Sequence, residues 1–419
     1  MTIRFFSYIL LIAAIVSGCS QVTRVSNMNM AHSYHMEKRS INPVYHISHV
    51  DERLSLVSME VNTNQLFYVR DAREEFFLAN YQLTLSLYTS FEKRGHTHTE
   101  VRKFTDTLYI DENRLVKSEI TIPLAMGNSY NVFILFEDLN RRTSETTLLT
   151  TDKRTIFSEG FFTASAVDDT SIYFPPFHLP ANKEFVITHA RAIDFSLEVQ
   201  RYPLFENIPT AAYVTSQEEK RIDSFQPDSI FIINFSGGTT RFQLPGNGIY
   251  RFSEPGNKES GFTIRSFRND FPQTPTNEQM LLPLRYITSG SEFTALFALG
   301  DAQLAAERFW SRSAGNPDRA ASIMSNYNRR VVKANSLFSS YLPGWQTDKG
   351  MIYIVFGPPD MVFHGDDGET WYYKEGLNRP GAELNFVRVN NFLSDNHYEL
   401  ERKSAYRRNW NLAVDRWRR

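Results

Sequence analysis

The chain has 419 residues, of which 42% are hydrophobic and 14% aromatic, so we expect two or three domains with packed cores. Aromatic side chains fit the pleated, half-buried surface of a sheet, and their abundance favours β structure. The formal net charge of −2 excludes a global field that would recruit nucleic acid. After the N-terminus, no segment approaches the roughly 20 apolar residues of a membrane-spanning helix.

Residues 1–18 have the pattern of a secretory signal peptide, since Arg4 precedes an apolar run over residues 5–16. Cys19 follows directly and is the only cysteine in the chain, which excludes a disulfide framework. The letters VSGC that end at Cys19 resemble the lipobox of bacterial lipoproteins. The resemblance implies that Cys19 is lipidated, and two or three acyl chains would anchor the protein durably. The alternative is a secreted protein with an incidental cysteine.

Ser20 stands after the cysteine, where an aspartate is associated with retention in the inner membrane of some bacteria. We therefore predict a lipid-anchored outer-membrane protein that faces the periplasm. Residues 19–50 are predicted as a tether, because they are polar and lack clear periodicity up to Pro43.

Four histidines lie in or just after the polar part of the predicted tether, in two pairs with H-x-x-H spacing. They are His32, His35, His46 and His49. Because no cysteine or carboxylate cluster joins them, solvated histidines are favoured over a metal site.

Short runs of alternating apolar and polar residues fill most of the chain from residue 51 to residue 269. LSLVSMEVN, YQLTLSLYTSF and SYNVFILFED belong to a first set, which predicts a β-sandwich domain at residues 51–163. EFVITHA, FSLEVQRY and SIFIINFS belong to a second, which predicts another at residues 164–269. We expect a multidomain, mainly β protein with two Ig-like β-sandwich domains and an α/β (α+β) C-terminal domain at residues 280–419.

The C-terminal domain begins with helical patterns. Apolar residues keep helical spacing in residues 300–312 and again after Asn316, where Pro317 suits the first position after a cap. Three strand signals follow, at ETWYY, ELNFVRVN and HYELER. The last residues, from 404, predict a helix that docks its tryptophans on the domain. Binding to anionic lipid or polysaccharide through its arginines is the alternative.

The stretch GWQTDKGMIYIVFGPPD at residues 344–360 predicts a turn, a strand and a second turn. Met351–Phe356 is apolar on both faces, which is typical of a strand buried on both sides. Asp348-Lys349-Gly350 suits a tight turn in which glycine takes a positive φ, and Gly357-Pro358-Pro359 would stop the strand. Residues 361–373 predict a hairpin closed by the loop GDDG.

The residues Gly344-Trp345-x-Thr347-Asp348, followed by ETWYY, resemble the GWxTD domain. PLRYITSGSEF, ERFW and the final DRWRR are also similar to that family, so the resemblance covers residues 281–419. The family's members are bacterial envelope proteins, many from Bacteroidetes, and often carry signal peptides. The resemblance therefore implies a GWxTD domain-containing lipoprotein and carries over no catalytic residue.

Two interpretations of the polar residues near the motif remain open. Asp348 together with either Asp360 or Glu369 could serve hydrolysis as a carboxylate pair, although acidic residues in GDDGE are usually a solvated turn. The other interpretation is a recognition groove for peptide or glycan, with core packing as its structural alternative. Its candidate binding residues are Trp345, Thr347, Asp348, Pro358, Pro359, Trp371 and Tyr372.

We expect a non-catalytic binding or assembly module for an envelope protein or polysaccharide, held at the membrane by its lipid anchor. No P-loop, zinc signature, nucleophile elbow or dinucleotide fingerprint occurs in the sequence, so no cofactor and no metal are predicted. Nucleic acid is not an expected partner. An envelope hydrolase that uses the clustered carboxylates is the alternative.

Overall fold

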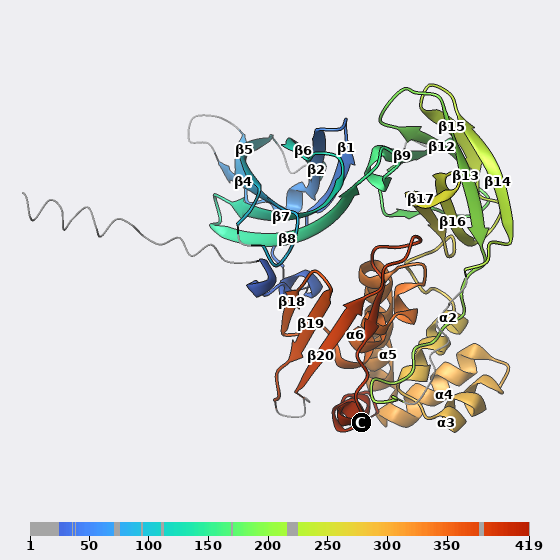
Figure 1. Cartoon of the computed structure of the whole chain (residues 1–419). Coiled ribbons are helices and arrows are strands. Elements are labelled where there is room, and N and C mark those ends of the chain that lie inside the picture. Colours follow the sequence, from blue (N-terminus) through green and yellow to red (C-terminus); the bar gives the residue numbers. More distant parts are fainter. Residues whose placement is uncertain are drawn as a thin grey trace, which may run out of the picture.

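A mainly β N-terminal region with several sheets precedes a mixed α/β C-terminal region (Figure 1). The predicted order of these two kinds of structure is confirmed, whereas the Ig-like topology of the β part stays a prediction. Cys19 and the predicted signal peptide lie outside the described residues. The computed structural model describes residues 25–418 except for residues 36, 38, 71–75, 94, 110–112, 169–170, 216–224 and 377–380.

The first β region contains two sheets with a common core. One has the strand order β1-β2-β6, and the other has the order β3-β4-β7-β8 with β5 paired to β4. Strands such as β6 alternate exposed and buried residues, because successive side chains point to opposite faces. Met59, Leu85 and Ile134 belong to the core that both sheets share. The bounds are β1 (Val44–His49), β2 (Leu54–Asn62), β3 (Val69–Arg70), β4 (Phe77–Tyr88), β5 (His98–Leu108), β6 (Leu115–Pro123), β7 (Asn128–Asp138) and β8 (Thr143–Lys153).

The second β region again has two sheets, in the orders β10-β9-β12-β15 and β11-β17-β16-β13-β14. Its core is rich in phenylalanine, and the Phe262 ring lies 4.1 Å from that of Phe162 and 4.7 Å from that of Phe252. The bounds are β9 (Phe162–Ala166), β10 (Ile172–Tyr173), β11 (Phe177–His178), β12 (Glu184–His189), β13 (Phe195–Tyr202), β14 (Ser229–Phe235), β15 (Thr239–Gln243), β16 (Gly248–Glu254) and β17 (Asn257–Ser266).

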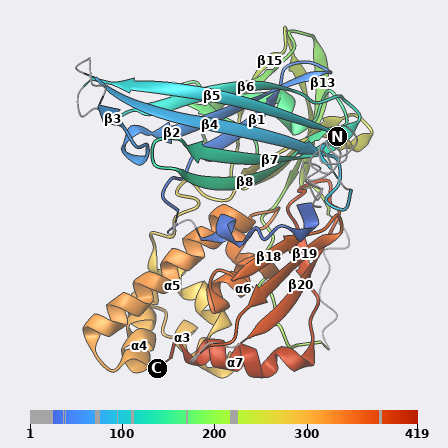
Figure 2. The ribbon, with the colours of Figure 1, turned by 90° about the vertical axis from the view of Figure 1, so that its left-hand side faces the viewer.

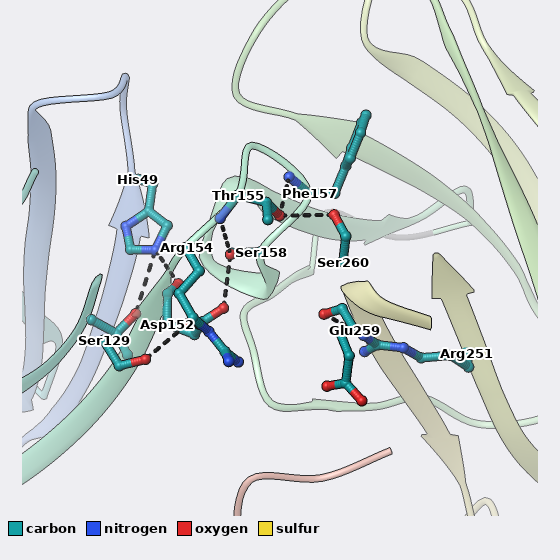
Figure 3. Close-up of polar contacts among 11 residues, drawn as sticks. His49, Ser129, Asp152, Arg154, Thr155, Phe157, Ser158, Arg251, Glu259 and Ser260 are labelled. Carbon is teal, nitrogen blue, oxygen red and sulfur yellow. Dashed lines mark hydrogen bonds and ion pairs between the residues drawn. The ribbon is translucent and has the colours of Figure 1, made fainter. Parts of the chain in front are cut away.

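Hydrogen bonds hold the loop that connects the two β regions, after β8 (Figure 3). The carboxylate of Asp152, near the end of β8, accepts hydrogen bonds from Ser129 Oγ at 2.9 Å, Arg154 Nε at 2.6 Å and Ser158 Oγ at 2.8 Å. Ser260 Oγ on β17 donates to Thr155 Oγ1 at 3.0 Å. The connecting loop is therefore hydrogen-bonded to both regions.

The C-terminal region combines an antiparallel sheet, in the order β18-β19-β20-β21, with helices that share its core (Figure 2). Its strands are β18 (Met361–His364), β19 (Gly368–Tyr373), β20 (Ala382–Arg388) and β21 (Tyr398–Leu400). Its helices are α2 (Asn277–Leu281), α3 (Gly290–Phe297), α4 (Ala302–Ala314), α5 (Pro317–Phe338), α6 (Asp348–Phe356) and α7 (Arg407–Asp415). Short 3₁₀ helices are η1 (Val25–Asn27), η2 (Ala31–Tyr34), η4 (Thr63–Gln65), η5 (Glu159–Phe161), η6 (Leu282–Tyr286), η7 (Gly344–Gln346) and η8 (Ser404–Tyr406).

Several local predictions for this region are confirmed. Helix α5 begins at Pro317, and the side chain of the Asn316 cap accepts a hydrogen bond from the Arg319 backbone N–H. Strands β18 and β19 form the predicted hairpin. Helix α7 docks on the domain and buries Trp410.

The segment that was predicted as a tether is folded wherever it is described. Residues 44–49 form β1, which pairs with β2. Met30, Ala31 and Tyr34 are buried in the core of the C-terminal region, and the Met30 backbone N–H donates to the Val362 carbonyl at 2.8 Å. The tether prediction is therefore wrong for these residues, because residues 44–49 pair with the next strand, while Met30, Ala31 and Tyr34 pack against the distant C-terminal region.

The four histidines of this segment have separate surroundings. His32 contacts the Thr146 carbonyl at 2.8 Å, and His35 contacts the Pro359 carbonyl at 2.8 Å. His46 stacks on Phe174, and His49 contacts Ser55 Oγ at 2.9 Å. Within the described ranges, no group of three or more potential metal ligands is found. In the same ranges, no helix is long and apolar enough to cross a bilayer.

Candidate functional site

The motif at residues 344–350 starts a helix, so the predicted turn and strand are wrong. Thr347 is the N-cap of α6, and its hydroxyl accepts a hydrogen bond from the Gly350 backbone N–H at 3.1 Å. The same hydroxyl donates to the Gly344 carbonyl at 2.8 Å. Every residue of α6 is buried, and a helix that is covered on all sides loses the amphipathic periodicity that would have revealed it.

Gly344 and Gly350 are required by close backbone approach. A Cβ at Gly344 would lie 1.9 Å from the Ala334 carbonyl oxygen of α5. A Cβ at Gly350 would lie 1.8 Å from the Gly344 carbonyl oxygen. Because both obstacles are backbone atoms, no side-chain movement relieves them. The two glycines therefore let α5, η7 and α6 pack against one another.

Trp345 is held in the interior by its own backbone. Its N–H donates to Asn335 Oδ1 at 3.1 Å, and its carbonyl accepts a hydrogen bond from the Tyr286 hydroxyl at 2.6 Å. The residue is only 9% exposed. Of the two alternatives for this ring, a recognition groove or the core, the structure places it in the core.

Asp348 is neutralised by Arg402, which follows β21. Arg402 Nη2 lies 2.6 Å from Asp348 Oδ1, and Arg402 Nη1 lies 3.0 Å from Oδ2. The Leu400 backbone N–H also donates to Oδ2, at 2.7 Å. Both side chains are less than one-tenth exposed. The carboxylate therefore joins the first turn of α6 to the end of the sheet.

Glu369 lies in a second buried ion pair, with Lys349 Nζ at 2.6 Å. Its other oxygen accepts hydrogen bonds from Trp371 Nε1 at 2.9 Å and from the Tyr34 hydroxyl at 3.2 Å. Burial alone would raise the pKa of Glu369, but the charges of Lys349 and His364 hold it well below its usual range. Lys349 Nζ also lies 3.4 Å from the Tyr398 ring centroid.

The remaining predicted residues lie in and after the loop that follows α6. Pro359 is buried, while Pro358 and Asp360 are partly exposed. Asp360 accepts a hydrogen bond from the Lys374 backbone N–H at 2.8 Å. Tyr372 is half-buried and packs against Phe363.

The structure therefore separates the predicted carboxylates into different roles. Asp348 and Glu369 belong to two distinct buried ion pairs, and Asp360 holds the turn after β19. Trp345, Thr347, Asp348 and Trp371 are all 9% exposed or less. Their side chains maintain the domain, which leaves Pro358 and Asp360 as predicted residues that line an open surface.

That surface is a groove of about 560 Å³ at the C-terminal end of α6, which we call the basic groove. Its walls come from the N-terminal segment, α5, the end of α6 and the C-terminal residues. Four cationic side chains and two carboxylates are among the lining residues. These charged residues are Glu37, Arg329, Arg330, Lys333, Asp360 and Arg416.

Sequence reasoning missed the cations that α5 supplies to this groove and the partners of the buried acids, although the C-terminal arginines, which include Arg416, were considered for anion binding. Arg330 and Lys333 lie three residues apart on α5, which is the helical spacing that places two side chains on one face. That signal was present in the sequence. No local pattern could have paired Arg402 with Asp348 or brought Glu37 to α5, because those contacts join distant segments.

The chain thus has a mainly β N-terminal region with several sheets and a mixed α/β C-terminal region. The protein carries a GWxTD domain, since residues 248–419 match the family model with that description. The match begins in the second β region and so includes β16 and β17, which lie before the predicted start at residue 280.

No curated protein matches the chain. Among solved structures, it is similar to the crystal structure of a β-glucuronidase from Bacteroides uniformis, with 14% identity and a TM-score of 0.18. The match covers 33% of this chain and only 15% of the other. That likeness carries no argument about fold or activity.

Proposed function

We propose that this protein is a periplasm-facing outer-membrane lipoprotein that binds an envelope protein or polymer without catalysing a reaction. The anchor would be a lipidated Cys19 at the end of a signal peptide. The two β regions, as sandwich-type modules, would act as spacer and docking surface. The C-terminal domain would hold the ligand or partner.

One observation carries the binding role: an open groove lies at the C-terminal end of α6, the helix that the motif starts, while the motif's own polar groups are occupied inside the domain. Asp348 and Lys349 are satisfied by Arg402 and Glu369. Pro358, in the loop after α6, lines the groove together with residues of α5. Since the end of α6 and the loop after it form part of one wall, the motif supports a binding surface rather than reacting itself.

The alternative, an envelope hydrolase, has weaker support. General acid–base hydrolysis needs two carboxylates that converge on one open site. Asp348 and Glu369 each lie against a buried cation, and neither is among the residues that line the basic groove. A hydrolase of this kind would lose all activity on its substrate in the Asp360→Asn variant, and would leave that activity intact in a matched Asn326→Ala variant of the groove wall.

The binding role is tested by crosslinking in intact cells, followed by purification of the full-length protein and mass spectrometry of its partners. We expect the same envelope protein or polymer to be enriched in repeated experiments, and to be lost after the Cys19→Ala change releases the protein from the membrane. If no envelope component is enriched over a control lipoprotein, the binding role is refuted. If the Cys19→Ala protein stays in the membrane fraction, the anchor is refuted.

A further inference from the structure

The basic groove has more cationic than acidic side chains, and most of the cations lie on α5. Ile323, Asn326, Arg330 and Lys333 follow one another at intervals of three or four residues, so they share one face of the helix. The adjoining face, which includes Tyr327 and Val331, is buried in the core. One face of α5 thus packs the domain, while its neighbour presents cations to the groove.

Arg330 lies at the base of this arrangement. Its Nη1 donates to the carbonyls of Ile354 at 3.0 Å and Val355 at 3.5 Å, and its guanidinium stacks 4.6 Å from the Trp417 ring centroid. Burial lowers the pKa of Arg330 to about 10, and the nearby charge of Arg416 acts in the same direction. Within the described residues, Arg330 therefore has neutral hydrogen-bond partners and a second cation nearby.

Arg329 and Arg416 are exposed at the groove. Neither forms an ion pair with another described residue. Like charges gathered in this way repel one another, and an anion bound between them would relieve that repulsion. The chain itself supplies a partial substitute, since the carboxylate of Glu37 accepts a hydrogen bond from Lys333 Nζ.

Glu37 belongs to the N-terminal segment that lies across the C-terminal region (Figure 2). The hydrogen bond from Lys333 lowers the pKa of Glu37, and the charges of Lys333, Arg329 and Arg330 act in the same direction. Its side chain is still 60% exposed, so it is bound at the mouth of the groove and not sealed within it. An external anion with more charge could displace it.

We propose that the basic groove binds a phosphate monoester group, with Arg329, Arg416 and Lys333 as its contacts and Glu37 as an internal competitor. The inference rests on the proposed binding function and names its ligand chemistry. A phosphate monoester carries close to two negative charges at neutral pH and accepts several hydrogen bonds at once, which suits a group of guanidinium and ammonium donors. Guanidinium forks match phosphate oxygens in geometry as well as charge.

The test is calorimetric titration of the purified full-length protein in detergent with inorganic phosphate. We expect saturable binding that weakens as salt is added. The Arg329→Gln/Arg416→Gln variant should bind about tenfold more weakly or worse, because two charge-assisted contacts are lost. Both side chains are exposed, so the variant should fold. Arg308→Gln, at an exposed arginine of α4 outside the groove, is the matched control and should bind as the wild type does.

The Glu37→Gln variant should change the phosphate affinity in the opposite direction to the double arginine variant. Removal of the competing carboxylate should tighten phosphate binding several-fold, whereas a Glu37 that only stabilises the fold would leave binding unchanged or weaken it. Titration with glucose 6-phosphate and with soluble dihexanoyl phosphatidic acid then distinguishes a saccharide source from a lipid headgroup. Tighter binding of either one supports the groove and identifies the source.

The inference is overturned if the wild type binds no phosphate, or if the double variant and the Arg308→Gln control bind it equally well. These outcomes are separate from those of the crosslinking experiment. Partner enrichment without phosphate binding would refute the groove and keep the binding module. Phosphate binding without any enriched partner would keep the groove and refute the binding module.

Discussion

Arg402 donates two hydrogen bonds, of 2.6 and 3.0 Å, to the carboxylate of Asp348, which lies 54 positions earlier in the chain. The pair is almost completely shielded from water. Asp348 opens helix α6, and Arg402 lies just beyond β21, so the pair ties the helix to the sheet. Asp348, the last residue of the GWxTD motif, therefore has a structural role in this protein.

The Arg402→Ala variant should be strongly destabilised, because it leaves Asp348 as an uncompensated charge in the interior. We expect a loss of about 3–5 kcal/mol in the free energy of unfolding. All five tryptophans lie at residue 310 or later and are buried, so urea unfolding followed by tryptophan fluorescence reports on the C-terminal region.

The matched control is Lys403→Ala, which removes an exposed cation next to Arg402 in the sequence. It should change the free energy of unfolding by less than about 1 kcal/mol. A similar small loss in Arg402→Ala would contradict the structural role of the pair.

The Gly344→Ala and Gly350→Ala variants should fold poorly. In each, the new methyl group would lie within 2 Å of a backbone carbonyl oxygen. We expect losses of about 4 kcal/mol or more, at the upper end of single-residue effects. Gly290→Ala in α3 is the control, since its nearest neighbour would be an Arg285 side-chain atom at 3.9 Å. Soluble yield and thermal unfolding of the three variants measure the difference. Equal melting temperatures in all three would contradict the close backbone packing at Gly344 and Gly350.

The Thr347→Ala variant should lose about 1 kcal/mol, since α6 would then begin without its N-cap hydrogen bond. Thr347→Ser keeps the hydroxyl and should recover most of the loss. Thermal unfolding of both variants measures the difference. If serine were no better than alanine, the hydroxyl would have no part in starting the helix.

Acid should destabilise the protein through two buried histidines, His49 and His397, and the partly buried His178. Burial lowers the pKa of His49 and of His397 to about 4, and that of His178 to about 3. The unfolded chain takes up these protons near pH 6.5, before the folded protein does, so stability is full above pH 6.5 and falls towards pH 4. Each histidine contributes on the order of 3 kcal/mol to this loss.

The His397→Gln variant tests this sign in the C-terminal region. Its urea midpoint, read by tryptophan fluorescence, should depend less on pH between 7 and 5 than that of the wild type. Glu369 does not obscure the result, because a carboxylate with a lowered pKa adds stability that is lost only as pH falls below about 4.5. An unchanged pH dependence would show that His397 is protonated equally in both states.

Local patterns predicted the elements whose two faces differ. The alternation in strands such as β6 and the Asn316-Pro317 start of α5 gave the correct kind of structure. The hairpin of β18 and β19 was also evident from its apolar strands and Gly-Asp-Asp-Gly loop. In each case the feature depends on neighbours within a few residues, and these are visible in the sequence.

Helix α6 could not be assigned in that way. Met351–Phe356 is uniformly apolar, so periodicity distinguishes neither a strand nor a helix. Thr347 did carry a cap signal, but the Asp-Lys-Gly sequence after it equally suits a turn. What decided the helix was close packing of Gly344 and Gly350 together with the buried partners of Asp348 and Lys349. These are contacts with segments far along the chain.

The sequence alone thus determined the order of β and α/β regions, the GWxTD domain and, as a prediction still to be tested, lipidation at Cys19. The tertiary structure decided that the motif's tryptophan and aspartate face inward and that the supposed tether is folded. It also decided that the cations of the basic groove gather in one place. Local patterns record only how each segment alternates, whereas burial and charge pairing depend on which distant segments meet.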